Sequence, residues 1–382
     1  MQFQLTDEQT AIQETALTFA KERIAPFAAE WDEKDHFPVD VIRETAGLGM
    51  AAIYVPTEQG GSGLNRLDGA LIFEALAYGC PTISSYISIH NMVAWMVGRS
   101  GTAEQIAAWM PKLASMEWLS SYCLTEPGAG SDAAALKTRA ERAGDHYILN
   151  GTKQFISGAG AADFYFVFAR TGGEGAGGVS AFALLKDTPG LSFGAKEKKM
   201  GWNAQPTRQV IMENARVPAA NLIGGAEGQG FKLAMSGLDG GRINIGACSL
   251  GSAWAALDKA RQYMFERKAF GRNLADFQAL QFKIADMATD LEAARLMVYR
   301  GADALDRADP QATMYSAMAK RYATDLGFRI CNDALQIHGG YGYLKDFGLE
   351  KLVRDLRVHQ ILEGTNEIMR VVISRKVLGG NR

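Results

Sequence analysis

A short acidic segment near the C-terminus, HQILEGTNEIMR (residues 359–370), carries two carboxylates four residues apart. Glu363 follows an isoleucine and a leucine and precedes a glycine and a threonine, so burial of this segment would surround its carboxylate with apolar groups. Burial raises the pKa of a carboxyl group and makes its ionised form a stronger base. If the segment is helical, Glu367 lies on nearly the same face. Because most glutamates lie at the surface, the residues alone leave each of them open as a base or as a solvated acid.

A second segment, SSYCLTEPGAGSDAAALKTRA from Ser120 onward, combines hydroxyl groups with glycines. Its hydroxyl side chains include Tyr122, Thr125 and Ser131, and the glycines between them let a ligand approach the backbone closely. Such a loop can present N–H donors to a phosphate or to a flat polar ring. The alternative is an ordinary glycine-rich turn between strands.

A third segment, GEGAGG (residues 173–178), matches the G-x-G-x-x-G spacing of a dinucleotide-binding loop. That motif functions between a strand and a helix whose N-terminus receives the pyrophosphate. Here the residues that follow, VSAFALLK, have the composition of a strand. We therefore predict a hairpin loop.

The composition argues against several classes of function. The chain has 382 residues, of which 47% are hydrophobic and 21% charged, as expected for a globular protein of two or three domains. A net charge of −2 provides no field for nucleic acid or an anionic membrane. The four cysteines and five histidines lack the spacing of metal ligands, so we predict no metal site. The N-terminus has no apolar signal-peptide core, and no apolar run is long enough to span a bilayer.

The elements that must position these residues fall into three regions, which together predict an α+β fold. Residues 1–117 have helical periodicity, beginning with a capping box of Thr6 and Gln9. Residues 118–232 contain short β-branched and aromatic runs, which predict a central antiparallel β-barrel or sandwich. In residues 233–382, apolar side chains from Phe277 to Val298 recur at steps of three and four, typical of a long helix in a helical bundle. The expected strands include residues 146–157, 162–170, 179–186 and 207–217.

Taken together, YCLTEPGAGSD and LEGTNEIMR closely resemble the two signatures of the acyl-CoA dehydrogenases. The resemblance continues in order through KQFIS, GWNAQPTR, ERKAFGR, ADFQALQFKIADMA and QIHGGYGY, and it covers nearly the whole chain. It implies N-terminal helices, a central β domain and a C-terminal four-helix bundle, in agreement with the three regions. It also implies a non-covalent FAD and a homotetramer, a dimer of dimers in which a neighbouring subunit completes each flavin site.

The reaction implied by the resemblance removes two hydrogens from adjacent carbons of an acyl-CoA. A base takes the α-proton, the β-hydrogen leaves as hydride to the flavin, and the electrons pass to an electron-transferring flavoprotein. The family motif places the base at the glutamate before Gly-Thr, which is Glu363. In a minority of relatives the base instead precedes the arginine matched by Arg242, but that position is Gly241 here.

The resemblance also implies binding residues, position by position. Those implied for FAD are Tyr122, Leu124, Thr125, Ser131, Phe155, Ser157, Arg267, Phe277, Gln278, Gln336, Gly339, Gly340, Thr365 and Glu367. Those implied for the substrate are Ser131, Asp239, Arg242 and Arg375. Phe155 stands where many relatives have tryptophan, and Arg267 would reach the FAD diphosphate across a dimer interface, since its fork suits two parallel hydrogen bonds. Each residue could instead be structural, as an ion pair, a cap or part of the core.

Within the family, LDGGRINIGACSLG, QIHGGYGYLKDF and RVHQILEGTNEIMR look most like the members that convert isobutyryl-CoA to methacrylyl-CoA in valine breakdown. The alternatives are a short-chain or 2-methylbutyryl-CoA dehydrogenase, an acyl-CoA oxidase and an inactive CoA-binding scaffold. We disfavour the oxidase because many oxidases have a longer C-terminal region. We expect a cytoplasmic bacterial protein, or a mature protein of the mitochondrial matrix.

Overall fold

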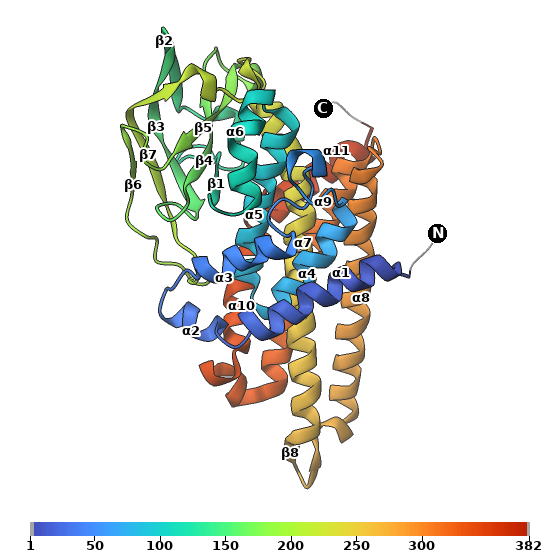
Figure 1. The fold of residues 1–382 in the computed structure, drawn as a ribbon. Coiled ribbons are helices and arrows are strands. Elements are labelled where there is room, and N and C mark those ends of the chain that lie inside the picture. Colours follow the sequence, from blue (N-terminus) through green and yellow to red (C-terminus); the bar gives the residue numbers. More distant parts are fainter. Residues whose placement is uncertain (1–3, 380–382) are drawn as a thin grey trace.

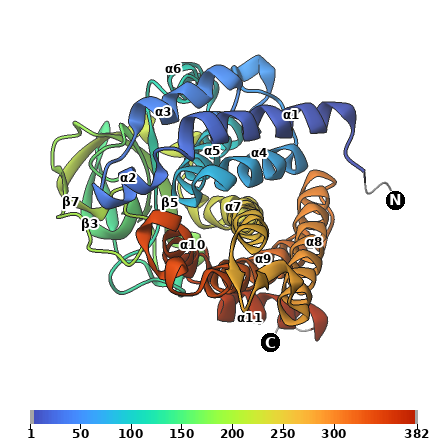
Figure 2. The ribbon, with the colours of Figure 1, turned by 90° about the horizontal axis from the view of Figure 1, so that it is seen from below.

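The computed structural model describes residues 4–379 and confirms the predicted α+β fold class. Figure 1 shows the β domain at one end of the molecule, beside helices of the N-terminal and C-terminal regions. The N-terminal helices are α1 (Asp7–Phe19), α2 (Ala28–Glu33), α3 (Val39–Glu44), α4 (Arg66–Gly79), α5 (Pro81–Ser100) and α6 (Ala103–Ala114), and a π-helical turn, Ala20–Ile24, continues α1. In Figure 2, α4 and α5 lie between α1 and the long helix α7 (Gly230–Glu266).

Side-chain caps set the beginnings of several of these helices. The Thr6 hydroxyl accepts a hydrogen bond from the Gln9 N–H, and the Gln9 side chain accepts one from the Thr6 N–H. This arrangement confirms the predicted capping box. Asn65 and Asp68 form the same arrangement at the start of α4.

The central region forms a seven-stranded sheet in the order β1-β4-β2-β3-β7-β6, with β5 paired to β4. Its strands are β1 (Ser120–Cys123), β2 (Arg139–Ala143), β3 (His146–Ser157), β4 (Phe164–Arg170), β5 (Val179–Leu185), β6 (Leu191–Phe193) and β7 (Thr207–Pro218). The four strands predicted from composition coincide with β3, β4, β5 and β7. Pairing is mostly antiparallel, but β2 meets β4 at one parallel pair of residues and β1 runs parallel to β4, so the predicted antiparallel domain was wrong for these two pairings. The β2–β3 hairpin lies between β1 and β4 in the chain and supplies the long crossover that parallel strands need.

The GEGAGG segment connects β4 to β5. These strands pair as an antiparallel hairpin, with Arg170 opposite Val179. The segment therefore follows a strand and leads into a strand, and the prediction of a hairpin loop is confirmed.

The C-terminal region is built on three long helices, α7, α8 (Gln278–Asp306) and α9 (Ala312–His338). The short helices α10 (Leu349–Arg357) and α11 (Asn366–Val377) pack against α9. In α8 the predicted apolar seam is buried from Met287 to Val298, whereas Phe277 is only partly covered. Because α7 begins at Gly230, the predicted boundary at residue 232 falls within its first turn.

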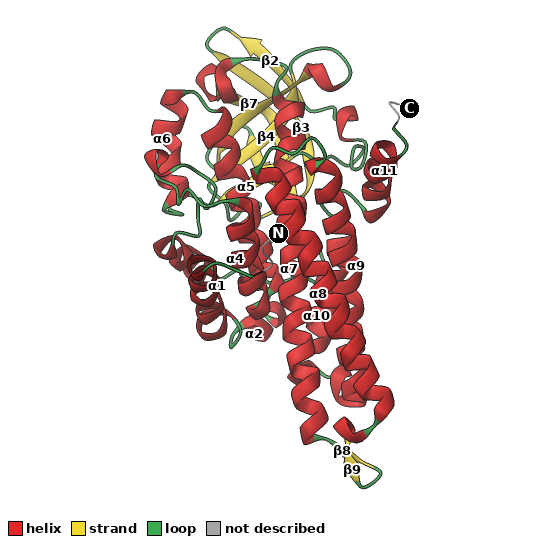
Figure 3. Ribbon diagram, turned by 90° about the vertical axis from the view of Figure 1, so that its right-hand side faces the viewer, coloured by secondary structure: helices red, strands yellow, loops and turns green. Residues whose placement is uncertain are grey.

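The long helices give the C-terminal region two distinct ends. Figure 3 shows the sheet at one end and, at the other, a hairpin of β8 (Lys268–Ala269) and β9 (Arg272–Asn273) between α7 and α8. The helix α11 lies toward the sheet end. Within residues 4–379, no helix combines the length and the apolar character needed to cross a membrane.

Candidate active site

Glu363 lies in the loop that precedes α11. Its φ of 54° and the φ of 92° at Gly364 are left-handed, so the chain turns sharply at this point. The carboxylate oxygen Oε2 is buried and has no hydrogen-bond partner among the described residues. Burial raises the pKa of Glu363 to about 7, against the opposing effects of Lys320 and Arg242. A buried, unpartnered carboxylate with a pKa near neutrality has the properties of a general base.

Glu367 stands in different surroundings, exposed in the first turn of α11. Its own backbone N–H and the Thr365 hydroxyl lower its pKa. Thr365 caps α11 and accepts a hydrogen bond from the Ile368 N–H at 3.3 Å. The two glutamates do not share a helical face, because the segment is not helical at Glu363: a left-handed turn there precedes the helix.

The helix α7 packs directly against the Glu363 carboxylate. A Cβ atom at Gly241 would lie 2.5 Å from Oε2, so this position has no room for a side chain. The next residue, Arg242, is buried; its Nη1 donates to Asp239 Oδ1 at 2.7 Å and its Nε donates to the Glu363 carbonyl at 3.4 Å. The second oxygen of Asp239 accepts a hydrogen bond from Thr313 at 2.7 Å. The structure thus brings the predicted residues Asp239, Arg242 and Glu363 together.

Sequence reasoning missed Lys320, a residue of α9 with no exposed surface. Its Nζ donates to the Gly364 carbonyl and to Asn366 Oδ1, both at 2.9 Å. Burial lowers the pKa of Lys320 to about 8. The sequence does contain a signal, because Lys320 is three residues from both Ala317 and Ala323 and therefore lies on an apolar helix face.

A buried ion pair holds the glycine-rich segment after β1. Lys153 of β3 has no exposed surface, and its Nζ donates to the Leu124 carbonyl at 3.1 Å and to Glu126 Oε1 at 2.8 Å. The Glu126 carboxylate also accepts the backbone N–H groups of Lys137 and Thr138. Although burial opposes it, Lys153 lowers the pKa of Glu126. The backbone beside the predicted flavin residue Leu124 is therefore fixed from the protein interior.

The other side of this segment is open. A Cβ atom at Gly128 or Gly130 would meet no atom within 4 Å. Phe155, at a left-handed φ of 59°, is 64% exposed. Tyr122 points inward, and burial together with the charge of Glu363 raises its pKa well above the usual value. Open backbone beside an exposed aromatic ring leaves a surface that a flat ligand can cover.

The remaining residues predicted for the flavin ring lie in or beside the same segment. Ser157, at the end of β3, accepts a hydrogen bond from Gln205 at 3.1 Å through its hydroxyl. The Thr125 carbonyl accepts the N–H of Gln154 at 2.8 Å. Ser131 is exposed in the loop after the two glycines.

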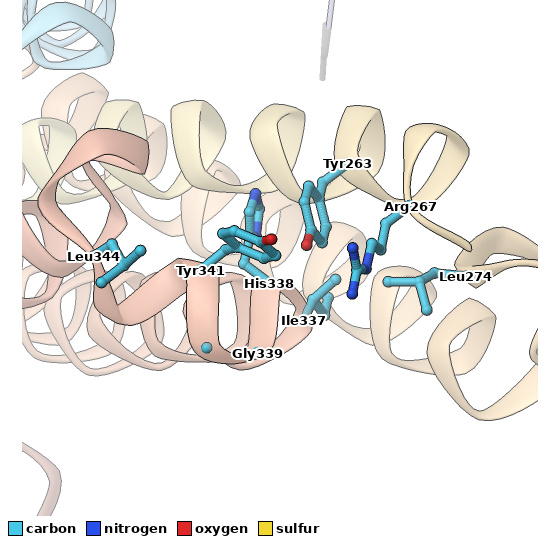
Figure 4. A pocket seen from close by; sticks show the side chains of 9 residues that line it. Tyr263, Arg267, Leu274, Ile337, His338, Gly339, Tyr341 and Leu344 are labelled. Atoms are coloured by element: carbon cyan, nitrogen blue, oxygen red, sulfur yellow. The ribbon is translucent and has the colours of Figure 1, made fainter. Parts of the chain in front are cut away.

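A second group of predicted residues surrounds a cavity of about 380 Å³ near the hairpin end of α7 and α9 (Figure 4). Its lining residues are Tyr263, Arg267, Leu274, Ile337, His338, Gly339, Gly340, Tyr341 and Leu344. The Arg267 guanidinium lies 5.4 Å from the centre of the Tyr341 ring. At 1.5 Å per helical residue, Arg267 is about 37 Å along α7 from Arg242. Within one chain, this cavity is therefore a separate site from the one formed by Glu363, Asp239 and Arg242.

Four of the residues predicted to bind FAD or substrate lie outside both the site around Glu363 and the cavity beside Arg267. Phe277 and Gln278 begin α8 beside the β8–β9 hairpin, and Gln336 is exposed in the last turn of α9. Arg375 is exposed near the C-terminal end of α11, the opposite end from Glu363. The structure does not bring Arg375 to the Asp239–Arg242 pair.

Family models match the three regions in order. The N-terminal domain of acyl-CoA dehydrogenases matches residues 6–117, the middle domain residues 121–215, and the C-terminal domain residues 228–378. The chain belongs to the acyl-CoA dehydrogenase family. It is therefore an oxidoreductase that acts on acyl-CoA, as the resemblance of its motifs predicted.

Individual acyl-CoA dehydrogenases are similar over nearly their full length. The mitochondrial isobutyryl-CoA dehydrogenase of Bos taurus is 56% identical over 98% of this chain and 90% of its own. Among solved structures, butyryl-CoA dehydrogenase from Megasphaera elsdenii is 39% identical, with a TM-score of 0.96 over 99% of this chain and 100% of its own. A chain solved in work on the electron transferring flavoprotein of Acidaminococcus fermentans is 42% identical, with a TM-score of 0.97 over 100% of both chains.

Acyl-CoA dehydrogenases are FAD-dependent, and the residues present here fit that cofactor. The open backbone at Gly128 and Gly130 and the exposed Phe155 ring leave a place for a flat isoalloxazine, and Tyr122 of the same segment is close enough to Glu363 for its charge to raise the tyrosine pKa. Arg267 lines the separate cavity, and its guanidinium fork can donate two parallel hydrogen bonds to a diphosphate.

Proposed function

We propose that this acyl-CoA dehydrogenase converts isobutyryl-CoA to methacrylyl-CoA, a step of valine breakdown, with Glu363 as the catalytic base. The observation that supports Glu363 is its buried Oε2, which has no hydrogen-bond partner within residues 4–379 and faces Gly241. The substrate rests on 56% identity to a mitochondrial isobutyryl-CoA dehydrogenase, compared with 39% to a butyryl-CoA dehydrogenase.

The residues around Glu363 support removal of the α-proton. Oε2 accepts the proton, and the dry surroundings that raise the pKa to about 7 make the carboxylate a stronger base than a solvated glutamate. The Glu363 N–H has no backbone acceptor in the described part of the chain, so it can donate to the thioester oxygen as negative charge develops there. Arg242 donates to the Glu363 carbonyl and pairs with Asp239, and we assign these two side chains to the CoA arm. When bound, FAD supplies the hydride acceptor for the β-hydrogen.

The separation of the two groups of site residues supports a cofactor site shared between subunits. Tyr122, Leu124, Thr125, Phe155 and Ser157 would hold the flavin ring of one subunit. The cavity beside Arg267, which is about 37 Å along α7 from Arg242, would hold the diphosphate or adenine of a flavin bound mainly by a neighbour.

Exposed apolar side chains at the hairpin end support the proposal of an interface there. Phe270 is 94% exposed, Phe265 65% and Tyr343 80%, and apolar exposure of this kind marks a contact surface. We include the predicted homotetramer, a dimer of dimers, and FAD contacts from Phe277, Gln278 and Gln336 in this proposal. Thr365 and Glu367 complete the proposed FAD set, and Ser131 and Arg375 the proposed substrate set.

The electron acceptor in the proposal is an electron-transferring flavoprotein. The likeness to a chain solved in work on such a flavoprotein supports this choice. The mitochondrial location of the bovine relative supports a matrix protein if the source is eukaryotic, and a cytoplasmic one if it is bacterial.

A substrate panel tests the proposed function. We expect kcat/KM to be highest for isobutyryl-CoA among isobutyryl-, 2-methylbutyryl-, isovaleryl- and n-butyryl-CoA, with graded losses, since one methylene in an apolar pocket is worth about 1–3 kcal/mol. A tenfold preference for n-butyryl-CoA would refute the branched-chain substrate and leave the family reaction intact. Rapid reoxidation of the substrate-bleached protein by air would instead favour an oxidase.

A further inference from the structure

Lys320 carries a charge that its hydrogen bonds do not neutralise. Burial of an ammonium group is costly unless the charge is paired. The Lys320 Nζ donates to a backbone carbonyl, that of Gly364, and to the amide oxygen of Asn366, both at 2.9 Å. Among the described residues, no carboxylate forms an ion pair with it. The acid whose charge most favours protonated Lys320 is Glu363.

The same contacts attach α9 to the loop that carries Glu363. Besides accepting from Lys320, Asn366 donates to Asp325 Oδ1 at 2.7 Å and to Thr324 Oγ1 at 3.0 Å. A left-handed φ is strained for a glutamate and persists only when the surrounding structure holds it. Lys320 binds the carbonyl of Gly364, directly after the strained residue.

We propose that Lys320 is a positioning residue for Glu363: it holds the turn that aims the carboxylate at Gly241, and its charge keeps that carboxylate ionised. This inference rests on the proposed role of Glu363 as the base. It assigns to a buried lysine of α9 a part in proton abstraction, although its hydrogen bonds go to Gly364 and Asn366 and not to the Glu363 carboxylate.

Of the two positive charges that act on Glu363, those of Lys320 and Arg242, the charge of Lys320 is the less compensated by an ion pair. Burial keeps Tyr122 of β1 and Cys248 of α7 neutral, because it raises the pKa of the tyrosine well above its usual value and that of the thiol to about 12. Arg242 of α7 is charged, but Asp239 pairs with it at 2.7 Å. Lys320 has no such partner, and it is the largest effect that opposes the rise in the pKa of Glu363.

The direction of the expected effect follows from these charges. Glu363 accepts a proton only when ionised, so kcat/KM falls as the pH drops through its pKa, about 7 in the free protein. Without the Lys320 charge this pKa is higher. The acid limb, the part of the pH profile in which kcat/KM falls as the pH drops, then moves to higher pH by about one unit or more. At pH 7 a shift of one unit lowers kcat/KM about fivefold, because the ionised fraction falls from about one half to about one eleventh, and the loss is recovered at higher pH.

The test compares Lys320→Met, Lys320→Gln and Lys320→Arg in the FAD-loaded protein. One readout is the pH profile of kcat/KM with the best substrate of the panel. The other is the exchange of the α-protons of methylthioacetyl-CoA with D₂O, followed by NMR. This compound has sulfur at the β position, so it can lose an α-proton but no hydride. Lys351→Met serves as a matched control, because Lys351 is buried in α10 and paired with Asp355.

We expect Lys320→Met and Lys320→Gln to shift the acid limb upward in both readouts, and Lys320→Arg to stay near the wild-type limb. Lys351→Met should lower thermal stability without moving the limb. A uniform loss of rate in Lys320→Met and Lys320→Gln, with the limb unmoved, would mean that Lys320 is only structural. If the methionine variant does not fold, the comparison of glutamine with arginine decides the question in the same way.

A failure of the underlying base assignment has a different signature. If Glu363→Gln exchanges the α-protons at the wild-type rate, Glu363 is not the base, whatever the Lys320 variants show. If Glu363→Gln abolishes exchange and the Lys320 variants leave the limb in place, the base assignment stands and only the role of Lys320 is overturned.

Discussion

Replacement of Glu363 by glutamine should give a protein that is less active and, above neutral pH, more stable than the wild type. Glutamine keeps nearly the same shape but can neither ionise nor accept the α-proton. Because a positioned base contributes about 10²–10⁴-fold, we expect the rate of α-proton exchange to fall by that factor. The gain in stability follows from the burial that makes the carboxylate a good base.

The size of that gain can be worked out from the pKa. Folding raises the pKa of Glu363 from 4.5 to about 7, and burial is the largest cause. Between these values the folded protein binds the proton more tightly than the unfolded chain, so its stability falls as the pH rises and stays lower above this window. At 1.36 kcal/mol per pKa unit, the ionised carboxylate lowers the free energy of unfolding by about 3 kcal/mol at pH 8. The glutamine variant does not have this penalty.

The measurement is thermal unfolding of both proteins from pH 5 to pH 8.5 under one scan rate. We expect nearly equal Tm values at pH 5 and a Tm of the variant higher by a few degrees at pH 8. Glu367→Gln is the control, since this carboxylate is exposed and no gap should open. A gap that does not change with pH, or a variant less stable at pH 8, would show that the Glu363 carboxylate is solvated and that the reasoning is wrong.

Three further outcomes are expected. Gly241→Ala should lower kcat/KM strongly, because its methyl group would lie 2.5 Å from Glu363 Oε2. Gly246→Ala is the control and should keep near wild-type kinetics, because its methyl group would meet a valine methyl at 3.1 Å. Equal kinetics of the two variants would show that the carboxylate lies elsewhere. The wild-type profile of kcat/KM should fall on the acid side with a midpoint near pH 7, and a midpoint near 4.5 would contradict a buried base. Arg267→Ala should lose FAD on gel filtration, measured by flavin absorbance per protein, while kcat with saturating FAD changes little; a loss of kcat alone would move Arg267 out of the cofactor site.

Local patterns in the sequence predicted the elements well, because local interactions determine them. The capping box at Thr6 and the short apolar runs of β3 and β4 need only near neighbours in the chain. The parallel pairing of β1 with β4 joins segments more than forty residues apart, and strand composition contains no information on it. The proposed cofactor site is of the same kind, since its parts come from distant segments.

Only the resemblance of whole motifs to those of a known family predicted which positions belong to the candidate site. Composition left Glu363 and Glu367 equivalent, and the helical spacing between them was misleading because a left-handed turn precedes α11. What separates them is burial, which depends on Gly241 and Arg242 of another helix. The position of Lys320 on an apolar helix face indicates that it is buried. The sequence does not show which groups it contacts, because these lie more than forty residues away along the chain.

The length of α7 has a consequence for how such chains can vary. The helix joins Arg242, beside one site, to Arg267, beside a second site that would serve another subunit's cofactor. Insertion of a single residue between them would rotate everything beyond it by about 100° and move it by 1.5 Å, turning Arg267 away from its cavity. Substitutions within α7 can be absorbed one at a time, but insertions and deletions cannot. Differences in chain length between homologues should therefore fall outside this helix, with the β8–β9 turn and the surface loops of the sheet as the permissive places.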